Sequence, residues 1–428
     1  MNPFAIPNFR AFFAARLAAN IASGMLVIVI GWQVYDLARA TMSTKDAAFL
    51  LGMIGLAQFL PLFALTLVAG WVADHVDRRL IARAANALTA VCAAVLAALA
   101  LTGGVTIPAL FAVAVVLGIG RAFAGPAISA LAPNLVPRDL LPKAIAWNSI
   151  SWQAGAVLGP PLGAFLYAVA PAAPYIVSSL LFALTVAGLF LIGPVPRPAP
   201  SLLSPWAATL EGLGYVRNNQ IVLGAISLDL FAVLLGGATA MLPVYARDVL
   251  HVGVAGLGPL RAAPAAGAAI TALVLTRWQV KRHVGVTMFV CVGLFGIATI
   301  VFGLSTWVPL SLGALAVLGA ADMVSVYIRS ALIQLHTPDA MRGRVSAVSG
   351  VFISASNELG EFESGVTAAW LGPVEAVVAG GVGAVVVTAI WAWRFPGLRR
   401  ADRFVAPEAG SPAASEAAIT IEQQETRA

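Results

Sequence analysis

Residues 70–79 read GWVADHVDRR and place two aspartates and two arginines between two long apolar runs. The flanking segments, 47–72 and 80–102, are each long enough to cross a hydrocarbon core of about 30 Å as a helix. Charged side chains in so short a connector are stable only where water or headgroups reach them. The stretch therefore predicts two neighbouring membrane helices joined by a tight, charged turn.

The composition of the whole chain supports this interpretation. Of its 428 residues, 60% are hydrophobic and 10% are charged, whereas about 25% are charged in ordinary globular domains. The mean hydropathy is +0.92. Twelve segments have the length and composition of membrane spans: 11–35, 47–72, 80–102, 106–130, 144–169, 174–193, 220–245, 256–276, 284–304, 308–332, 345–370 and 374–393. We expect an all-α membrane protein with twelve transmembrane helices.

The distribution of cations predicts the orientation in the membrane. The N-terminus and the loops on its side hold eighteen of the 25 Lys and Arg residues, whereas the opposite loops hold Arg39, Lys45 and Arg247. Because loops rich in Lys and Arg stay in the cytoplasm, both termini are expected inside, in a bacterial cytoplasmic membrane. This asymmetry and attraction to anionic lipids account for the net charge of +6 without a nucleic-acid partner.

Other classes of protein find little support in the sequence. Cys92 and Cys291 lie in separate spans and the four histidines are scattered, so neither a disulfide framework nor a metal site is expected. Motifs of the DDxxD, HExxH and Walker types are absent from the sequence, which argues against an enzyme and against an ATP-driven pump. We expect no cofactor, and the sequence shows no pore-lining polar ring typical of a channel.

An internal repeat predicts two halves. An offset of 201 residues superimposes spans four and five on spans ten and eleven, and its most informative pairs are Gly118 with Gly319, Pro137 with Pro338 and Lys143 with Arg344. Parallel repeats of this kind are typical of transporters with two similar halves. We therefore expect a six-helix half at 1–193, a cytoplasmic linker at 194–219, a second half at 220–400 and a disordered cytoplasmic tail at 401–428, with a surface helix after Ser204.

The span count, the central linker and the charged turn together resemble the major facilitator superfamily. Its signature loop, usually written G-x-x-x-D-x-x-G-R-R, is matched by Gly70, Asp74, Arg78 and Arg79, whereas Asp77 replaces the usual glycine. The resemblance implies that this loop forms a cytoplasmic gate that latches the two halves together. Asp74 would face a helix N-terminus and nearby cations, and the arginines would meet partners on the other half.

Two further motifs carry the resemblance. Arg121 and Gly125 resemble the intramembrane R-x-x-Q-G pattern of the family, with Ala124 in place of glutamine. The sequence GAVLGPPLG at 155–163 resembles the antiporter motif of proton-coupled exporters. Its small residues allow close helix contacts and its prolines bend the helix, so we expect a hinge against span eight formed by Gly155, Gly159, Pro160 and Gly163.

Within the superfamily, the chain resembles the drug:proton antiporter group that includes bacterial enterobactin exporters. The likeness is carried by NFR at 8–10, WQVYDL at 32–37, the stretch GRAFAGPAISALAPNLVP from Gly120 and the stretch from Thr337 to Gly365. It implies a monomer that exports a small organic solute, such as a siderophore, in exchange for protons, in contact with membrane lipids. Multidrug efflux is the main alternative, and import or a non-transporting sensor of the same fold stays open.

Charged residues inside the spans are the candidates for proton coupling or solute binding: Arg121, Asp229, Asp322, Glu358 and Glu361. Each costs about 2.5 to 3.5 kcal/mol at the centre of an inserted helix. The repeat places Arg121 opposite Asp322, so the two are expected to form a charge pair between the halves.

The acids of span eleven are the candidates for the proton carrier. Glu358 and Glu361 share a helix face, whereas Glu363 points elsewhere. We hypothesise that one of the first two, together with Asp229 or Asp322, carries the proton. Structural pairing of the span-eleven acids with Arg16, Arg121 or Arg329 is the alternative.

Overall fold

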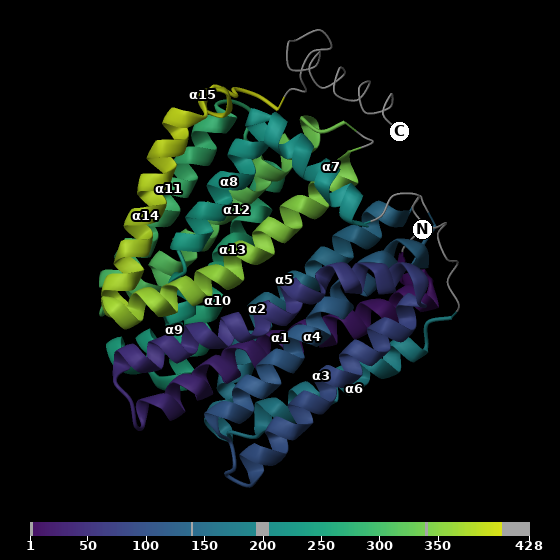
Figure 1. The fold of residues 1–428 in the computed structure, drawn as a ribbon, viewed down its shortest axis with the longest axis vertical. Helices are drawn as coiled ribbons and strands as arrows, with labels where there is room; N and C mark the ends of the chain where they lie inside the picture. Colours follow the sequence, from purple (N-terminus) through teal and green to yellow (C-terminus); the bar gives the residue numbers. More distant parts are fainter. Residues whose placement is uncertain (1–2, 138–139, 194–204, 339–340, 405–428) are drawn as a thin grey trace.

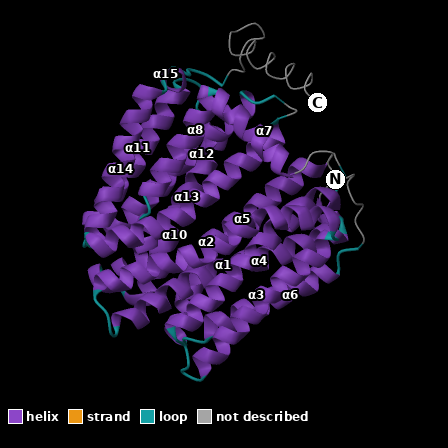
Figure 2. Ribbon diagram, viewed as in Figure 1, coloured by secondary structure: helices purple, strands orange, loops and turns teal. Residues whose placement is uncertain are grey.

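The computed structural model describes residues 3–137, 140–193, 205–338 and 341–404, and these residues form helices and short connections (Figures 1 and 2). The first six long helices are α1 (Pro7–Arg39), α2 (Thr44–His75), α3 (Arg78–Leu101), α4 (Ile107–Leu131), α5 (Leu141–Val169) and α6 (Ala173–Phe190). The later ones are α7 (Pro205–Asn218), α8 (Gln220–Leu235), α10 (Gly253–Arg277), α11 (Val284–Leu304), α12 (Val308–Leu335), α13 (Arg342–Trp370) and α14 (Pro373–Arg394). Short elements are η1 (Pro3–Ala5), η2 (Ala132–Leu135), η4 (Ala238–Met241), α9 (Leu242–Val244), η5 (Tyr245–Val249) and α15 (Pro396–Arg399). The all-α prediction is confirmed.

Ten of the described helical segments are long and apolar enough to cross a bilayer, and α5 and α13 are not among them. The sequence predicted both as spans. Their lower hydropathy has a physical reason, because α5 carries Pro160 and Pro161 and α13 carries three glutamates. Both helices also lie inside the bundle: α5 packs against α1 and α10, and α13 packs against α2 and α8.

The span predicted at 220–245 is interrupted. Helix α8 begins at the cap Asn219, whose side chain accepts hydrogen bonds from the backbone N–H groups of Ile221 and Val222. It ends at Leu235, before Gly236 and Gly237, and the chain continues through η4 and α9 into the π-helical turn η5. Paired glycines lower helix stability, so the break falls where helix propensity is weakest. The predicted apolar segment thus consists of α8 followed by three short helical elements.

The helices form two groups that meet near α9 and α10 and spread apart toward α7 and the start of α1 (Figure 1). Helices α1–α6 pack among themselves, as do α8 and α10–α14, and the strongest contacts between the groups join α2 with α13 and α5 with α10. We name the face that holds α7 and the start of α1 the inner face, which the charge asymmetry predicts to be cytoplasmic, and the opposite face the outer face.

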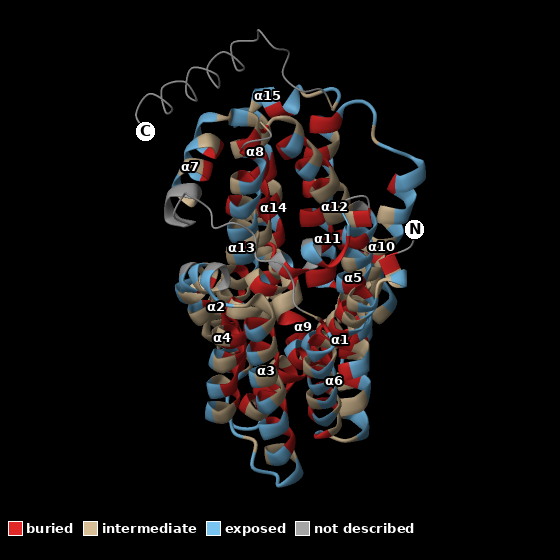
Figure 3. Ribbon diagram, turned by 90° about the vertical axis from the view of Figure 1, so that its right-hand side faces the viewer, coloured by how far each residue is buried: buried red, intermediate tan, exposed pale blue. Residues whose placement is uncertain are grey.

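Buried residues follow the lines along which helices meet, whereas exposed residues cover the outside of the bundle (Figure 3). Many exposed residues are large and apolar: Leu180 and Leu184, one turn apart on α6, are 63% and 58% exposed. A continuous apolar exterior is unstable in water and is what lipid chains require. The chain is a multi-pass membrane protein.

The linker contains the surface helix that was expected after Ser204. Helix α7 packs through Gly212 and Val216 against the inner end of α13, and Glu211 forms an ion pair with Arg344. Leu210 and Leu213 lie on its exposed face. Residues 194–204 of the predicted linker and 405–428 of the predicted tail lie outside the described residues.

Candidate solute cavity and charge network

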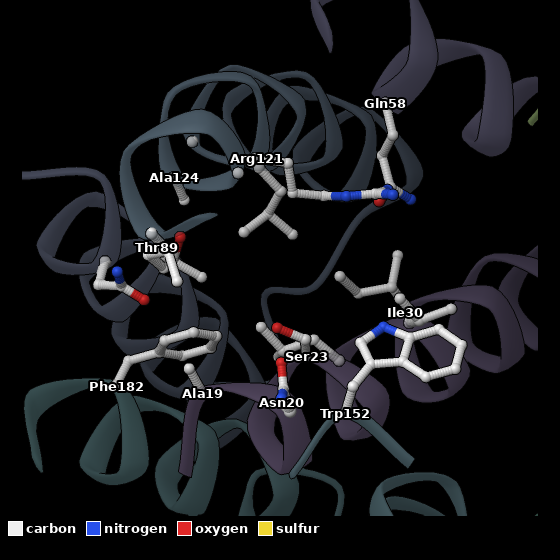
Figure 4. A pocket seen from close by; sticks show the side chains of 17 residues that line it. Ala19, Asn20, Ser23, Ile30, Gln58, Thr89, Arg121, Ala124, Trp152 and Phe182 are labelled. Atoms are coloured by element: carbon white, nitrogen blue, oxygen red, sulfur yellow. The ribbon is translucent and has the colours of Figure 1, made fainter. Parts of the chain in front are cut away.

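A cavity of about 310 Å³ lies among helices α1–α6. Arg121 extends toward Gln58 on one side of the cavity, whereas Trp152 and Phe182 lie on the opposite side, with Asn20 and Ser23 between them (Figure 4). Further lining comes from Asn86 and Thr89 of α3 and from aliphatic residues of α1 and α4. Aromatic faces combined with a few convergent polar groups are typical of small-molecule sites. Among the described residues that line this cavity, Arg121 is the charged one.

Arg121 joins the cavity to the other group of helices. Its Nη2 donates to Oε1 of Glu358 on α13 at 2.7 Å. The Arg121 side chain is 48% exposed, whereas that of Glu358 is 13% exposed. The arginine therefore faces the open cavity, and the carboxylate that neutralises it lies deeper in the protein. The sequence-based prediction that both residues lie at the functional centre stays open, but the structure brings them together.

A second ion pair lies one turn along α13. Nη2 of Arg261 on α10 is 3.9 Å from Oε1 of Glu361. Glu361 also packs against Gly55 of α2, because a Cβ added to Gly55 would lie 3.0 Å from the Glu361 carboxylate. Arg261 was not among the intramembrane charges expected from the sequence. Its position between Pro259 and Pro264 in an otherwise uncharged span was the available signal.

A third charged group lies entirely in the second set of helices. Asp229 of α8 and Arg329 of α12 form an ion pair, and their side chains are 9% and 5% exposed. Asp322 and Ser325, also on α12, line a small cavity beside Asp229. Among the described residues, no hydrogen bond or ion pair joins Asp322 to a partner. This site has two acids for one arginine.

The charge pair predicted between Arg121 and Asp322 is not formed in this structure. Although α4 and α12 are equivalent in the repeat, Arg121 binds Glu358, and Asp322 faces α8 and α11 within its own group. Equivalent positions of two halves need not meet, because each half rotates its helices toward its own packing partners. Glu363 accepts a hydrogen bond from Thr367 on the same helix at 2.7 Å.

The expected hinge motif packs mainly against α1. A Cβ on Gly155, Gly159 or Gly163 would lie 2.5–2.9 Å from atoms of α1, so these glycines allow the two backbones to touch. The predicted contact with span eight, now α10, is made by the neighbouring Pro161, whose Cα lies 2.8 Å from a Cβ built on Gly258. Pro160 itself lies near Gly24 of α1.

The charged turn at 70–79 contains a helix cap that was not expected from the sequence. Helix α2 continues to His75, and Asp77 caps α3: its side chain accepts from the N–H of Arg79 at 2.9 Å and binds the Arg79 guanidinium at 2.7 Å. An acid is favoured at a helix N-terminus, which explains why this chain has Asp77 where the family motif has glycine. The side chain of Asp74 lies outside the described part of the structure.

Two arginines at the start of α3 bind the end of α6 and the residues just after it. Arg79 donates to the carbonyl of Ile192, and Arg83 donates to the carbonyl of Leu189. A Cβ on Gly70 would meet nothing within 4 Å. The expected latch between the halves is therefore not formed by Arg79 in this conformation.

Two reciprocal ion pairs, which the sequence analysis missed, join the halves at the outer face. Asp36 of α1 binds Arg247 of η5 at 2.6 Å, and Arg39 of α1 binds Asp248 at 3.0 Å. Tyr35 also donates to Asp248. Arg39 and Arg247 had been interpreted only as topology signals; the acid that accompanies each of them within three residues was the signal for pairing.

Two close backbone contacts reinforce this outer interface. A Cβ on Gly52 of α2 would lie 2.7 Å from Cα of Gly365 on α13, and Gly258 of α10 makes the similar approach to Pro161 of α5. The backbones of the two groups therefore also approach each other at these two places near the outer face. The two groups of helices are closed against each other at this face.

Comparison with known proteins identifies the family. Residues 9–361 match the profile of the Major Facilitator Superfamily. The chain belongs to the major facilitator superfamily. Among characterised members of this superfamily, the enterobactin exporter EntS of Citrobacter koseri is 27% identical over 387 residues, covering 89% of this chain and 90% of that protein. EntS proteins of Escherichia coli are 26% identical over 393 residues, with the same coverage.

Solved structures of major facilitator proteins agree with the fold. A bacterial homologue of the human lysosomal transporter Spinster, in an inward-facing and unoccupied conformation, aligns with a TM-score of 0.72 and 14% identity over 92% of this chain and 98% of that one. The xylose transporter XylE from E. coli in its inward-open conformation aligns with a TM-score of 0.67 and 14% identity over 96% and 99%. Together, the family and its exporter relatives identify a transporter rather than an enzyme.

Proposed function

We propose that this transporter exports a small organic solute from the cell in exchange for protons, by alternating access between the halves 1–193 and 220–400. The cavity lined by Arg121, with its aromatic and amide groups, carries the proposal, since it offers a site for an aromatic solute beside the Arg121–Glu358 contact between the two groups of helices. The enterobactin exporters that it resembles favour a siderophore or a related amphipathic compound.

The closed outer face and the separated inner ends support an inward-facing state of this cycle. In the opposite state, the outer ion pairs would open, and the turn at 70–79 would latch the inner ends. Both chain ends would then lie in the cytoplasm of a bacterium, as the positive charges predict.

Asp322 is the best candidate for the exchanged proton. Arg329 is engaged by Asp229, so Asp322 lies in a low-dielectric site without a cation of its own. A carboxylate in such a site is stabilised by taking up a proton. Glu358 and Glu361 each have an arginine partner, which makes them weaker candidates for a carrier that must change its charge in every cycle.

The test is accumulation in exporter-deficient bacteria that express the chain, measured with ethidium and with a catecholate siderophore, with and without a protonophore. We expect cells that express the chain to accumulate less siderophore than cells without it, and we expect the protonophore to abolish this difference. Loss of ethidium instead would favour multidrug efflux, and no change in either solute would contradict export.

Variants separate the proton carrier from the fold. We expect Asp322→Asn to abolish protonophore-sensitive export, whereas the matched control Glu363→Gln retains it, because Glu363 is bonded to Thr367 away from both cavities. Export by Asp322→Asn at the wild-type rate would remove Asp322 from the mechanism.

A further inference from the structure

The charge balance around Arg121 indicates which class of solute the cavity accepts. Arg121 and Arg261 face Glu358 and Glu361, so the cluster contains two positive and two negative charges. The positive member of the pair nearest the cavity, Arg121, is 48% exposed, whereas its partner Glu358 is 13% exposed. A solute entering the cavity therefore meets the guanidinium before it meets the carboxylate.

We propose that the solute carries an anionic group beside an aromatic body, and that this group replaces Glu358 on Arg121. This inference rests on the proposed function, because it takes the cavity at Arg121 as the solute site. A guanidinium offers several N–H donors in one plane and binds oxyanions through two parallel hydrogen bonds. Trp152 and Phe182, across the cavity, supply the surfaces for the aromatic part.

A cation does not fit this site as well. Among the described lining residues there is no acid, and the amide and hydroxyl groups of Asn20, Ser23 and Gln58 are neutral. A cationic solute would reach Glu358 only past Arg121, with which it shares the sign of its charge. An anion, in contrast, gains the exposed side of the guanidinium.

Displacing Glu358 has a consequence for protons. The freed carboxylate lies in a mostly buried position, one turn from Glu361, and Arg261 is 3.9 Å from Glu361. Helix α2 contributes the neutral Gly55 and Gln58 to this region. Three other charged groups face α13 away from this cluster: Glu211 pairs with Arg344 at the inner end, Lys45 of α2 donates to the carbonyl of Trp370 at the outer end, and Asp229 pairs with Arg329.

The anion and the displaced carboxylate would leave the cluster with one excess negative charge, which a proton on Glu358 removes. Anion binding and protonation of Glu358 are thus cooperative, and by linkage each strengthens the other. The proton in this step is distinct from the one that Asp322 exchanges.

The experiment is equilibrium dialysis of the purified full chain in detergent with three probes that share a naphthalene ring. These are 1-naphthalenesulfonate, the neutral 1-naphthalenesulfonamide and the cationic 1-naphthylmethylammonium. The sulfonate stays charged over the working pH range, so its pH dependence reports the protein. We expect the sulfonate to bind about tenfold more tightly than the sulfonamide, because one added charge-assisted hydrogen bond contributes a difference of about this size. We also expect the sulfonate to bind more tightly as the pH falls.

Variants identify the groups. Glu358→Gln should strengthen sulfonate binding and remove its pH dependence, because the competing carboxylate is lost. Arg121→Gln should remove the preference for the sulfonate while leaving sulfonamide binding intact, which also shows that the variant is folded. Trp152→Ala should weaken both probes.

Equal binding of the three probes, a preference for the cation, or weaker sulfonate binding by Glu358→Gln would overturn the inference. If Trp152→Ala changed neither probe, or if no probe bound, the cavity assignment would be overturned together with it. Failure of the proposed function is distinguishable, because the export assay would show no efflux while probe binding to the cavity persisted.

Discussion

The reciprocal ion pairs at the outer face should hold the transporter in its inward-facing state. Arg39–Asp248 and Asp36–Arg247 are partly exposed, with side-chain exposures of 25%/23% and 43%/31%. Solvent screening limits such pairs to about 0.2–1 kcal/mol each. Replacing Arg39 by Ala is therefore expected to raise the outward-open fraction by up to about fivefold, and replacing Arg39 and Arg247 together by up to about thirtyfold.

The assay is the rate at which a membrane-impermeant maleimide labels a cysteine placed at Ile30, in a background with Cys92 and Cys291 replaced by alanine. Ile30 is buried on α1 and lines the cavity, so external labelling requires the outer face to open. Exchange of the charges, Arg39→Asp with Asp248→Arg, should return the rate toward that of the background. High salt should reduce the differences, because it screens exposed charges.

Wild-type labelling rates in both alanine variants would refute the reasoning. So would a charge-exchanged protein that labels as fast as the single Arg39→Ala variant, because the effect would then not arise from the pair itself.

Three further outcomes follow from the packing. Gly365→Ala places a Cβ 2.6 Å from Cα of Gly52 and should lower the free energy of unfolding by about 1–3 kcal/mol, measured by thermal unfolding in detergent. The control is Gly350→Ala on the same helix, whose added Cβ meets nothing within 4 Å and should leave the stability unchanged. Asp229→Leu should destabilise by about 3–5 kcal/mol by leaving Arg329 buried and unpaired, and adding Arg329→Met should recover most of that loss; equal melting temperatures of the single and double variants would contradict this. Burial lowers the pKa of His336, which lies beyond the end of α12, so the unfolded chain binds more protons and stability should fall as the pH drops below about 6.5; His336→Gln should flatten that acid limb of the melting curve.

Most of the fold could be predicted from the sequence, because apolar segments of membrane length have few alternatives in a bilayer. The limits are physical. Helix α13 carries Glu358, Glu361 and Glu363, so its hydropathy reports its place inside the bundle rather than contact with lipid. The break after α8 depends on Gly236 and Gly237, a pair too short to override the hydropathy of the segment around it.

The candidate site was predictable in its residue types but not in its pairs. Depth along a span indicated that Arg121 and Glu358 lie near the centre, whereas their 2.7 Å contact depends on how α4 and α13 rotate and lean. The 201-residue repeat gave the wrong partner, since it relates positions in two halves without placing the halves together. The ion pairs at the outer face, Arg39–Asp248 and Asp36–Arg247, also depend on how the two halves are placed against each other. The sequence alone does not indicate that placement.

The two glycine contacts, Gly52 with Gly365 and Gly258 with Pro161, have a mechanical meaning. A line through these two contacts is an axis about which the two groups of helices can tilt. Both contacts lie near the outer face, so this axis is closer to the outer face than to the inner face. Helix α2 extends 23 residues from Gly52 to His75, or about 35 Å at 1.5 Å per residue. A tilt of about 10° would move its inner end by about 6 Å, while the outer end moves far less. A small displacement at the outer face therefore accompanies a wide opening at the inner face. Two weak ion pairs at the outer face can thus control a large movement at the inner face.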